Sequence, residues 1–239
     1  MRSSMSTIAR PDEIRAGVVV PDDMALDAEL WRWAPDGVSL LFTRIRHVDE
    51  DAVRQCVHDL KTAAPAAFAC ACTTDRLIDG LPGEKRLVEA MQSAGGGDAV
   101  TTAGAMLSAL THLGIRRLAM ATPHDATAAE QLVSFLAEAD VDVVGRARLE
   151  PTTDVWTVPY ERTIQLVRDA DADEAQAVLV SDINIATYDV IAPLEAELRK
   201  PVLTANQVTM WALLGAIGRE AVGPHQWLIS GPAVGDSSG

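Results

Sequence analysis

The chain has 239 residues, of which 48% are hydrophobic and 23% charged, and these proportions are typical of a globular protein with a substantial buried core. Its formal net charge of -14 would repel nucleic-acid phosphates and anionic membrane surfaces, and no stripe of Lys and Arg offsets that charge. We therefore expect neither nucleic acid nor a membrane as a partner.

The first segment, MRSSMSTIARPDEIRAG, has no apolar stretch of the kind found in secretory signals. No window of the chain approaches the roughly 18 uninterrupted apolar residues that a membrane span needs. The three cysteines are too few and too unevenly placed for a disulfide framework. We expect a cytoplasmic protein in a reducing compartment.

Short apolar runs then alternate with segments of helical period, which is typical of parallel strands joined by crossover helices. The predicted fold class is therefore α/β. The predicted strands cover residues 15–20, 38–45, 66–72, 99–101, 117–121, 141–148, 177–181 and 202–203. The clearest predicted helices between them cover residues 50–63, 84–92, 126–138, 160–169 and 188–198.

An internal similarity indicates two pseudo-symmetric halves. IRAGVVVPDD (14–23) resembles IRRLAMATPHD (115–125), and AAFACACTTD (66–75) resembles AQAVLVSDIN (175–184), each about a hundred residues further along. Chance could also produce this match, because β-α units share their pattern. We predict one half from residues 1–112 with 208–239 and a second from 113–207, in which Cys72 and Asp182 are counterparts.

Polar residues end several predicted strands, and ligands of open parallel sheets bind beyond such carboxyl ends. Cys72, Asp182 and the stretches 21–23 and 123–125 all lie there. If the two sheets face each other across a pseudo-twofold axis, Cys72 and Asp182 lie on opposite walls of one cleft. This cleft is the predicted active site.

Cys72 is the first candidate for chemistry. A thiol can be held as thiolate, can move a proton to or from carbon beside a carboxylate, and can add to an activated double bond. Backbone N–H groups of Thr73 and Thr74 could face a substrate carboxylate. The alternative is a buried structural cysteine, which is how we interpret Cys56 and Cys70.

Three other residues are candidates, and two of them also allow a structural interpretation. Asp182 could be an acid or base, although acids often end strands for local reasons. Asn206 could turn its amide to the cleft or could cap the following helix. His124 could act as an acid, a base or a carboxylate donor. No histidine has metal-ligand spacing to another histidine or to a cysteine, so we expect no metal.

Three segments resemble motifs of one known family. CTTDRLIDG (72–80) is similar to C-T-S-x-S-F-x-x-G, the segment 101–125 to T-x-x-A-x-x-x-A-L-x-x-L-G-x-x-R-x-A-x-x-T-P-Y, and the segment 178–211 to a longer motif that contains S-C-T-N and S-N-Q. These motifs belong to the aspartate/glutamate racemase superfamily, in the branch of maleate isomerase and arylmalonate decarboxylase. The resemblance implies two α/β halves with the active site between them, no cofactor, and a possible homodimer.

Within that branch, the stretch 17–45 most resembles the racemase-like proteins of ectoine and hydroxyectoine utilisation, whose start reads V-P-x-D-x-A-L-D-x-E-L-W-R-W. The chain departs from the wider family at the site. Cys72 matches the first of two family cysteines, but Asp182 replaces the second, which excludes a symmetric mechanism with two thiols. Asp22 and Asp23 replace residues of the P-S-S-N turn of the family, and His124 replaces the tyrosine of T-P-Y.

The added acids would favour a substrate with an ammonium or amidinium group, unless they point into solvent. We predict a cofactor-independent racemase or isomerase acting on a small amino acid or dicarboxylate-like metabolite. The alternatives are a decarboxylase and a metabolite-binding protein without catalysis. The predicted catalytic residues are Cys72 and Asp182, and the predicted substrate-binding residues are Asp22, Asp23, Thr73, Thr74, His124, Asn184 and Asn206.

Overall fold

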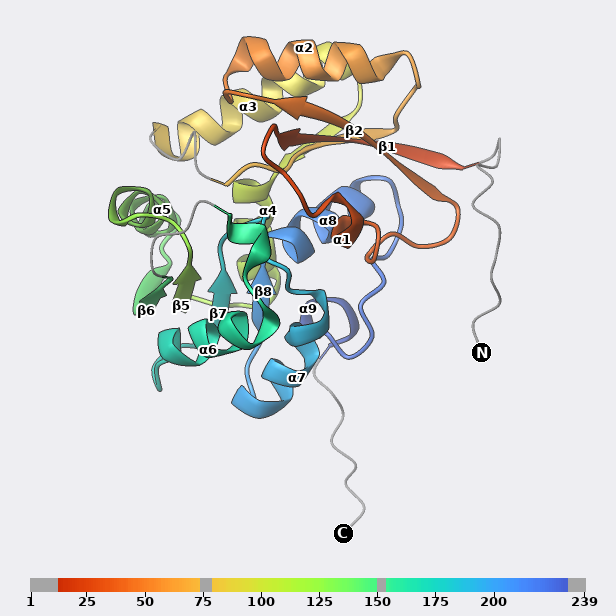
Figure 1. Cartoon of the computed structure of the whole chain (residues 1–239). Coiled ribbons are helices and arrows are strands. Elements are labelled where there is room, and N and C mark those ends of the chain that lie inside the picture. Colours follow the sequence, from red (N-terminus) through yellow and green to blue (C-terminus); the bar gives the residue numbers. More distant parts are fainter. Residues whose placement is uncertain (1–12, 74–78, 150–153, 232–239) are drawn as a thin grey trace.

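Two parallel sheets of four strands each form the framework of the computed structural model, which describes residues 13–73, 79–149 and 154–231 (Figure 1). The first sheet has the order β2-β1-β3-β4 and the second has the order β6-β5-β7-β8. The strands are β1 (Ile14–Pro21), β2 (Val38–Ile45), β3 (Ala67–Cys70), β4 (Asp98–Thr101), β5 (Arg117–Thr122), β6 (Asp142–Arg148), β7 (Ala177–Val180) and β8 (Val202–Thr204). Corresponding strands occupy the same places in the two sheets, so the predicted α/β class with pseudo-symmetric halves is confirmed.

Helices cover both faces of each sheet. Figure 1 shows α2 and α3 over the outer face of the first sheet, and α4 and α8 between the two sheets. The helices are α1 (Asp27–Leu30), α2 (Glu50–Lys61), α3 (Gly80–Gly95), α4 (Thr102–His112), α5 (Ala126–Glu138), α6 (Tyr160–Ala170), α7 (Tyr188–Leu198), α8 (Ala205–Ala216) and α9 (Trp227–Ser230), with a 3-10 turn at Val155–Thr157. In the described part of the chain, no helix is both long and apolar enough to cross a membrane.

The central strands are apolar on both faces because each sheet is buried on both sides. In β1, Val18 faces the central core between the sheets, whereas Val19 faces the layer under α2 and α3. In β7, Leu179 faces the same central core and Val178 packs under α6 and α7. This arrangement explains why these strands read as continuous apolar runs in the sequence.

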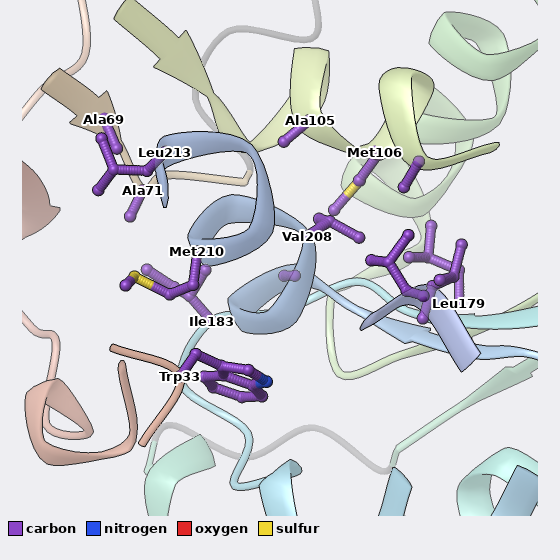
Figure 2. Close-up of a cluster of buried hydrophobic side chains, with 14 of the residues drawn as sticks. Trp33, Ala69, Ala71, Ala105, Met106, Leu179, Ile183, Val208, Met210 and Leu213 are labelled. Carbon is purple, nitrogen blue, oxygen red and sulfur yellow. The ribbon is translucent and has the colours of Figure 1, made fainter. Parts of the chain in front are cut away.

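Helix α8 joins the two halves through the central core. It packs against α4, β3 and β4, and also against β8, which directly precedes it. Figure 2 shows Leu213 of α8 beside Ala69 and Ala71, with Met210 on the side of Ile183 and Trp33. The alanines of the first sheet leave room for this helix to approach. The division of the chain at residues 112 and 207 remains a prediction.

The segment between Cys72 and α3 departs from the predicted boundaries. Strand β3 ends at Cys70 instead of 72, and α3 begins at Gly80 instead of 84. A carboxylate from the other half stabilises this early start, because the backbone N–H of Leu81 donates a hydrogen bond to Glu138 Oε2 at 2.9 Å. Gly80 has a φ of +59°, a left-handed backbone conformation that favours glycine, and a Cβ there would also displace the carboxylate of Glu138.

Glu195 is a buried carboxyl group in α7 that holds two other segments. It accepts hydrogen bonds from the backbone N–H groups of Val202 and Trp227, both at 3.0 Å. Burial raises the pKa of Glu195 from 4.5 to about 7, although both hydrogen bonds oppose this shift. The folded state therefore favours the protonated form, so the contribution of Glu195 to stability is complete below about pH 4.5 and is lost as the pH rises through 7.

We expect the Glu195→Gln variant to lose this pH dependence. Between pH 4.5 and 7.5, the free energy of unfolding of the wild type should fall by up to about 3 kcal/mol more than that of the variant. The measurement is chemical denaturation across this range. The control is Glu197→Gln on the same helix, an exposed residue paired with Arg168. Parallel pH curves for wild type and Glu195→Gln would contradict the assignment.

Candidate active site

A cavity of about 230 Å³ opens at the carboxyl ends of β1, β2, β3 and β7 and is lined by both halves of the chain. The first half contributes one wall and the loop after β7 the other. This is the location that strand-end residues predicted. The lining residues are Pro21, Asp22, Asp23, Ile45, Arg46, Val48, Cys72, Thr73, Asp182, Ile183 and Asn184.

Cys72 lies on the first wall, just beyond β3. The backbone N–H of Ala71 still donates to Val19 O at 2.8 Å, after which the chain leaves the sheet. Cys72 is partly exposed, whereas Cys56 and Cys70 are buried in the layer under α2 and α3. Thr73 also lines the cavity. Thr74, the next predicted binding residue, lies outside the described residues.

Asp182 lies on the second wall and is only 8% exposed. Its Oδ1 accepts a hydrogen bond from the backbone N–H of Asn184, and its Oδ2 lies 3.5 Å from His124 Nε2. Burial is the main cause that raises the pKa of Asp182, and the charge of Asp23 adds to the increase. His124 and the hydrogen bond from Asn184 act in the opposite direction. A carboxyl group in this environment can hold a proton closer to neutral pH than an exposed aspartate.

The loops after β1 and β2 bring both signs of charge to the cavity. Asp22 and Asp23 follow β1, and Arg46 follows β2. Arg46 Nε lies 3.3 Å from Asp22 Oδ2, with the two side chains 81% and 51% exposed. Among the described lining residues, Arg46 is the one Lys or Arg. Arg46 is not among the site residues predicted from the sequence, although its position after β2 matches the position of Asp22 after β1.

Asn184 lines the cavity, but its side-chain amide is held by the other half. Its Oδ1 accepts from the backbone N–H of Ala25 at 2.9 Å, and its Nδ2 donates to Asp23 O at 3.2 Å. These bonds fix the loop after β1 against the loop after β7. Asn184 therefore keeps the two walls in register, and Nδ2 retains one further N–H.

Asn206 is not among the lining residues. It is fully buried in the first turn of α8, where its Nδ2 lies 3.5 Å from Ile185 O and its side chain interacts with Glu29. The alternative that it caps α8 is wrong, because Thr204 is the capping residue and accepts from the backbone N–H of Gln207. Asn206 was expected in the cleft because it follows a strand end, but the helix begins there and turns its amide into the protein.

His124 is also absent from the lining, but it reaches the site through the carboxyl group of Asp182. Of the site residues predicted from the sequence, the cavity thus brings together Cys72, Thr73, Asp182, Asn184 and the two acids after β1. Within residues 13–73, 79–149 and 154–231, no group of three or more His, Cys, Asp or Glu residues could hold a metal ion.

Residues 14–226 match the sequence model of the arylmalonate decarboxylase family. A maleate isomerase from Nocardia farcinica is 28% identical over 172 residues, which are 68% of this chain and 68% of that protein. An arylmalonate decarboxylase from Bordetella bronchiseptica is 29% identical over 170 residues, which are 67% of this chain and 70% of that protein.

Solved structures of the same two activities share the fold. A mutant of arylmalonate decarboxylase in its liganded form superimposes with a TM-score of 0.83 at 24% identity, covering 91% of this chain and 99% of the other. A mutant of the Nocardia farcinica maleate cis-trans isomerase gives a TM-score of 0.78 at 24% identity, covering 88% and 96%. That structure holds a covalently bound succinylcysteine intermediate.

Proposed function

Because the chain belongs to the arylmalonate decarboxylase family, we propose that it is a cofactor-independent racemase or isomerase of a small carboxylate-bearing metabolite. The observation that carries the proposal is the placement of Cys72 and Asp182 on the two walls of one cavity. Two unlike acid/base groups can act on opposite faces of a carbon that lies between them.

In the racemase form of the proposal, the Cys72 thiolate removes the proton from the carbon next to the substrate carboxylate. The electron pair of the broken C–H bond moves into the carboxylate to give an enolate. Asp182, whose neutral form is favoured by burial, then donates a proton to the opposite face. Cys72 is left as the thiol and Asp182 as the carboxylate, which are the forms required to convert the other enantiomer.

In the isomerase form, the Cys72 sulfur adds to one carbon of a double bond and a proton is added to the other. Rotation about the new single bond, followed by loss of the same sulfur and a proton, gives the geometric isomer. The succinylcysteine in the Nocardia farcinica enzyme is the adduct expected of such an addition to maleate. One thiol is enough for this sequence, so the aspartate at position 182 does not prevent it.

The charges of the cavity favour a substrate with both an ammonium and a carboxylate group. Asp22 and Asp23 would attract the ammonium, and Arg46 would bind the carboxylate. A substrate with two carboxylates and no cation would face a surplus of negative charge. Diamino acids derived from ectoine have suitable groups, and the N-terminal resemblance to ectoine-utilisation proteins supports testing them first.

We expect the Arg46→Gln variant to bind such a substrate less tightly. Loss of a charge-assisted hydrogen bond should raise KM about 10- to 100-fold and change kcat much less, because the carboxylate is bound before and during the reaction. Steady-state kinetics would measure both constants. Arg54→Gln, which removes an exposed guanidinium paired with Asp51 on α2, is the matched control. An unchanged KM would show that Arg46 does not contact the substrate.

A decarboxylase is the second candidate, since a single cysteine can protonate the enolate that remains after loss of carbon dioxide. The arylmalonate decarboxylase of Bordetella bronchiseptica supports keeping this alternative. A binding protein that has lost catalysis would have the same fold.

The test is proton NMR in heavy water with 2,4-diaminobutyrate, its two monoacetyl forms, aspartate and maleate. Loss of an α-proton signal with retention of the carbon skeleton would support a racemase. Formation of fumarate would support an isomerase, and loss of a carboxyl group a decarboxylase. Line broadening of one compound without any reaction would favour the binding protein and would overturn the proposal.

A further inference from the structure

His124 contacts the carboxyl group of Asp182 without lining the cavity itself. Its Nε2 lies 3.5 Å from Asp182 Oδ2, and each of these side chains is 12% exposed. Nε2 is buried and makes no hydrogen bond within the described part of the chain. The backbone N–H of His124 donates to Thr122 Oγ1 at 3.2 Å, which fixes the loop between β5 and α5. The imidazole is therefore held against the carboxyl group of a cavity residue.

We propose that His124 and Asp182 share one acidic proton, and that His124 is a positioning residue which sets the protonation state of Asp182 for its proposed acid/base role. Of these two statements, only the second, the role of His124 in the acid/base chemistry of Asp182, rests on the proposed function. The pairing itself is a property of the protein without substrate.

The burial of both side chains gives the physical reason. The shared proton can sit on Asp182 Oδ2 beside a neutral imidazole, or on His124 Nε2 beside a carboxylate. Both arrangements have a net charge of zero, so neither places an uncompensated charge in the buried contact. Burial disfavours an isolated carboxylate at position 182.

Other charged groups near the pair cannot take the place of His124. Asp23 faces Asp182 from the loop after β1 and raises its pKa further. The side chain of Arg46 is 81% exposed and its Nε lies 3.3 Å from Asp22 Oδ2, and Cys72 lies on the opposite wall. Asp125, next to His124, uses its Oδ1 to accept from the backbone N–H of Ala128 at the start of α5.

The proton balance links the pair to the reaction. When Asp182 protonates the substrate carbon, its O–H bond breaks, a C–H bond forms, and the electron pair of the O–H bond stays on the carboxylate. The pair then has a charge of minus one. When Asp182 takes a proton from the opposite enantiomer, the pair returns to zero. His124 gains an N–H bond only when the shared proton moves to its Nε2.

Carboxyl carbon NMR of protein labelled at aspartate tests the pairing without any substrate. The Asp182 signal is assigned by its loss in Asp182→Asn. In His124→Gln, which removes the ionisable group but keeps a polar side chain, the titration midpoint of Asp182 should rise by about one pH unit or more. His124→Phe, which keeps an aromatic ring but removes its nitrogens, should give the same direction. His58→Gln, on the exposed face of α2, is the control and should give no change.

The second readout is the pH profile of deuterium exchange. In His124→Gln, the part of the pH profile that reflects the titration of Asp182 should move to higher pH by the same amount as the NMR midpoint. An unchanged NMR midpoint in folded His124→Gln or His124→Phe, checked by circular dichroism, would overturn the pairing. A shifted midpoint with an unshifted pH profile would overturn its role in the reaction. If the midpoint shifts but the protein exchanges no substrate proton, the pairing of His124 with Asp182 is supported and the proposed function is contradicted.

Discussion

Replacing Cys72 with serine is expected to lower the rate of α-proton exchange at least about a thousandfold. A serine hydroxyl has almost the same size as a thiol but is far weaker as an acid and is not a useful nucleophile without an adjacent base. Deuterium incorporation in heavy water, followed by proton NMR, measures the rate directly. The fold should be retained, because the side chain at position 72 is partly exposed at the edge of its hydrophobic layer.

The matched control is Cys56→Ala, which removes a thiol from α2, away from the cavity lining. Its activity should stay within about threefold of the wild type. Iodoacetamide labelling gives an independent check. Only Cys72 of the three cysteines is partly exposed, so alkylation should be confined to it and should be slowed by a bound substrate. Comparable exchange rates in Cys72→Ser and the wild type would show that the thiol does not take part in the reaction.

The fold could be predicted largely from the sequence because both sheets are buried on both faces. Strand β2 and helices α5 and α7 have the predicted bounds, and the other predicted strands and helices lie within a few residues of the observed ones. The largest difference, the start of α3, depends on Glu138 in a different part of the chain. A contact of this kind leaves no local pattern, so the glycine and proline near the start of α3 were interpreted as a loop.

The candidate site could be predicted in part for a similar reason. Cys72, Asp182 and the two acids after β1 follow directly from strand ends, which a parallel sheet brings together. Arg46 also follows a strand, but its long, exposed side chain reads as an ordinary surface residue. The internal amide of Asn206 and the partners of Asn184 depend on how the two halves meet, and a single sequence does not show this.

The site geometry therefore depends on contacts that hold the halves together. Besides the amide of Asn184, the segment around α1 makes several such contacts with the second half. Arg32 forms a two-point ion pair with Asp189, and its guanidinium lies 3.9 Å from the ring centroid of Tyr188. Trp33 Nε1 donates to Gln226 Oε1 at 3.0 Å, and Gln226, which belongs to the same predicted half, in turn donates from Nε2 to Tyr188 O of the second half at 3.4 Å. These contacts keep the loop after β1 close to the loop after β7.

Glu29 is the most buried charged group in this contact region. Its Oε1 accepts from the backbone N–H groups of Thr187 and Tyr188 at 2.8 and 3.0 Å, at the start of α7. Thr187 is the N-cap residue of α7 but makes no side-chain cap itself, so the carboxyl group of Glu29 supplies the cap from the other half. Burial raises the pKa of Glu29, and its hydrogen bonds with Thr187, Tyr188 and Asn206 oppose that increase.

We therefore expect Glu29→Ala to lower the free energy of unfolding by about 3 to 5 kcal/mol. The substitution leaves two buried N–H groups without an acceptor and removes packed atoms between the halves. Glu29→Gln keeps one carbonyl oxygen at nearly the same place and should cost about 1 kcal/mol, which makes it the matched control. Denaturant unfolding would measure the stability of both variants.

If the cap also sets the distance between the two walls of the cavity, exchange activity should fall in Glu29→Ala under conditions where the variant is still folded. Equal stabilities of the two variants would show that α7 does not need this carboxyl group, and that other contacts hold the halves together.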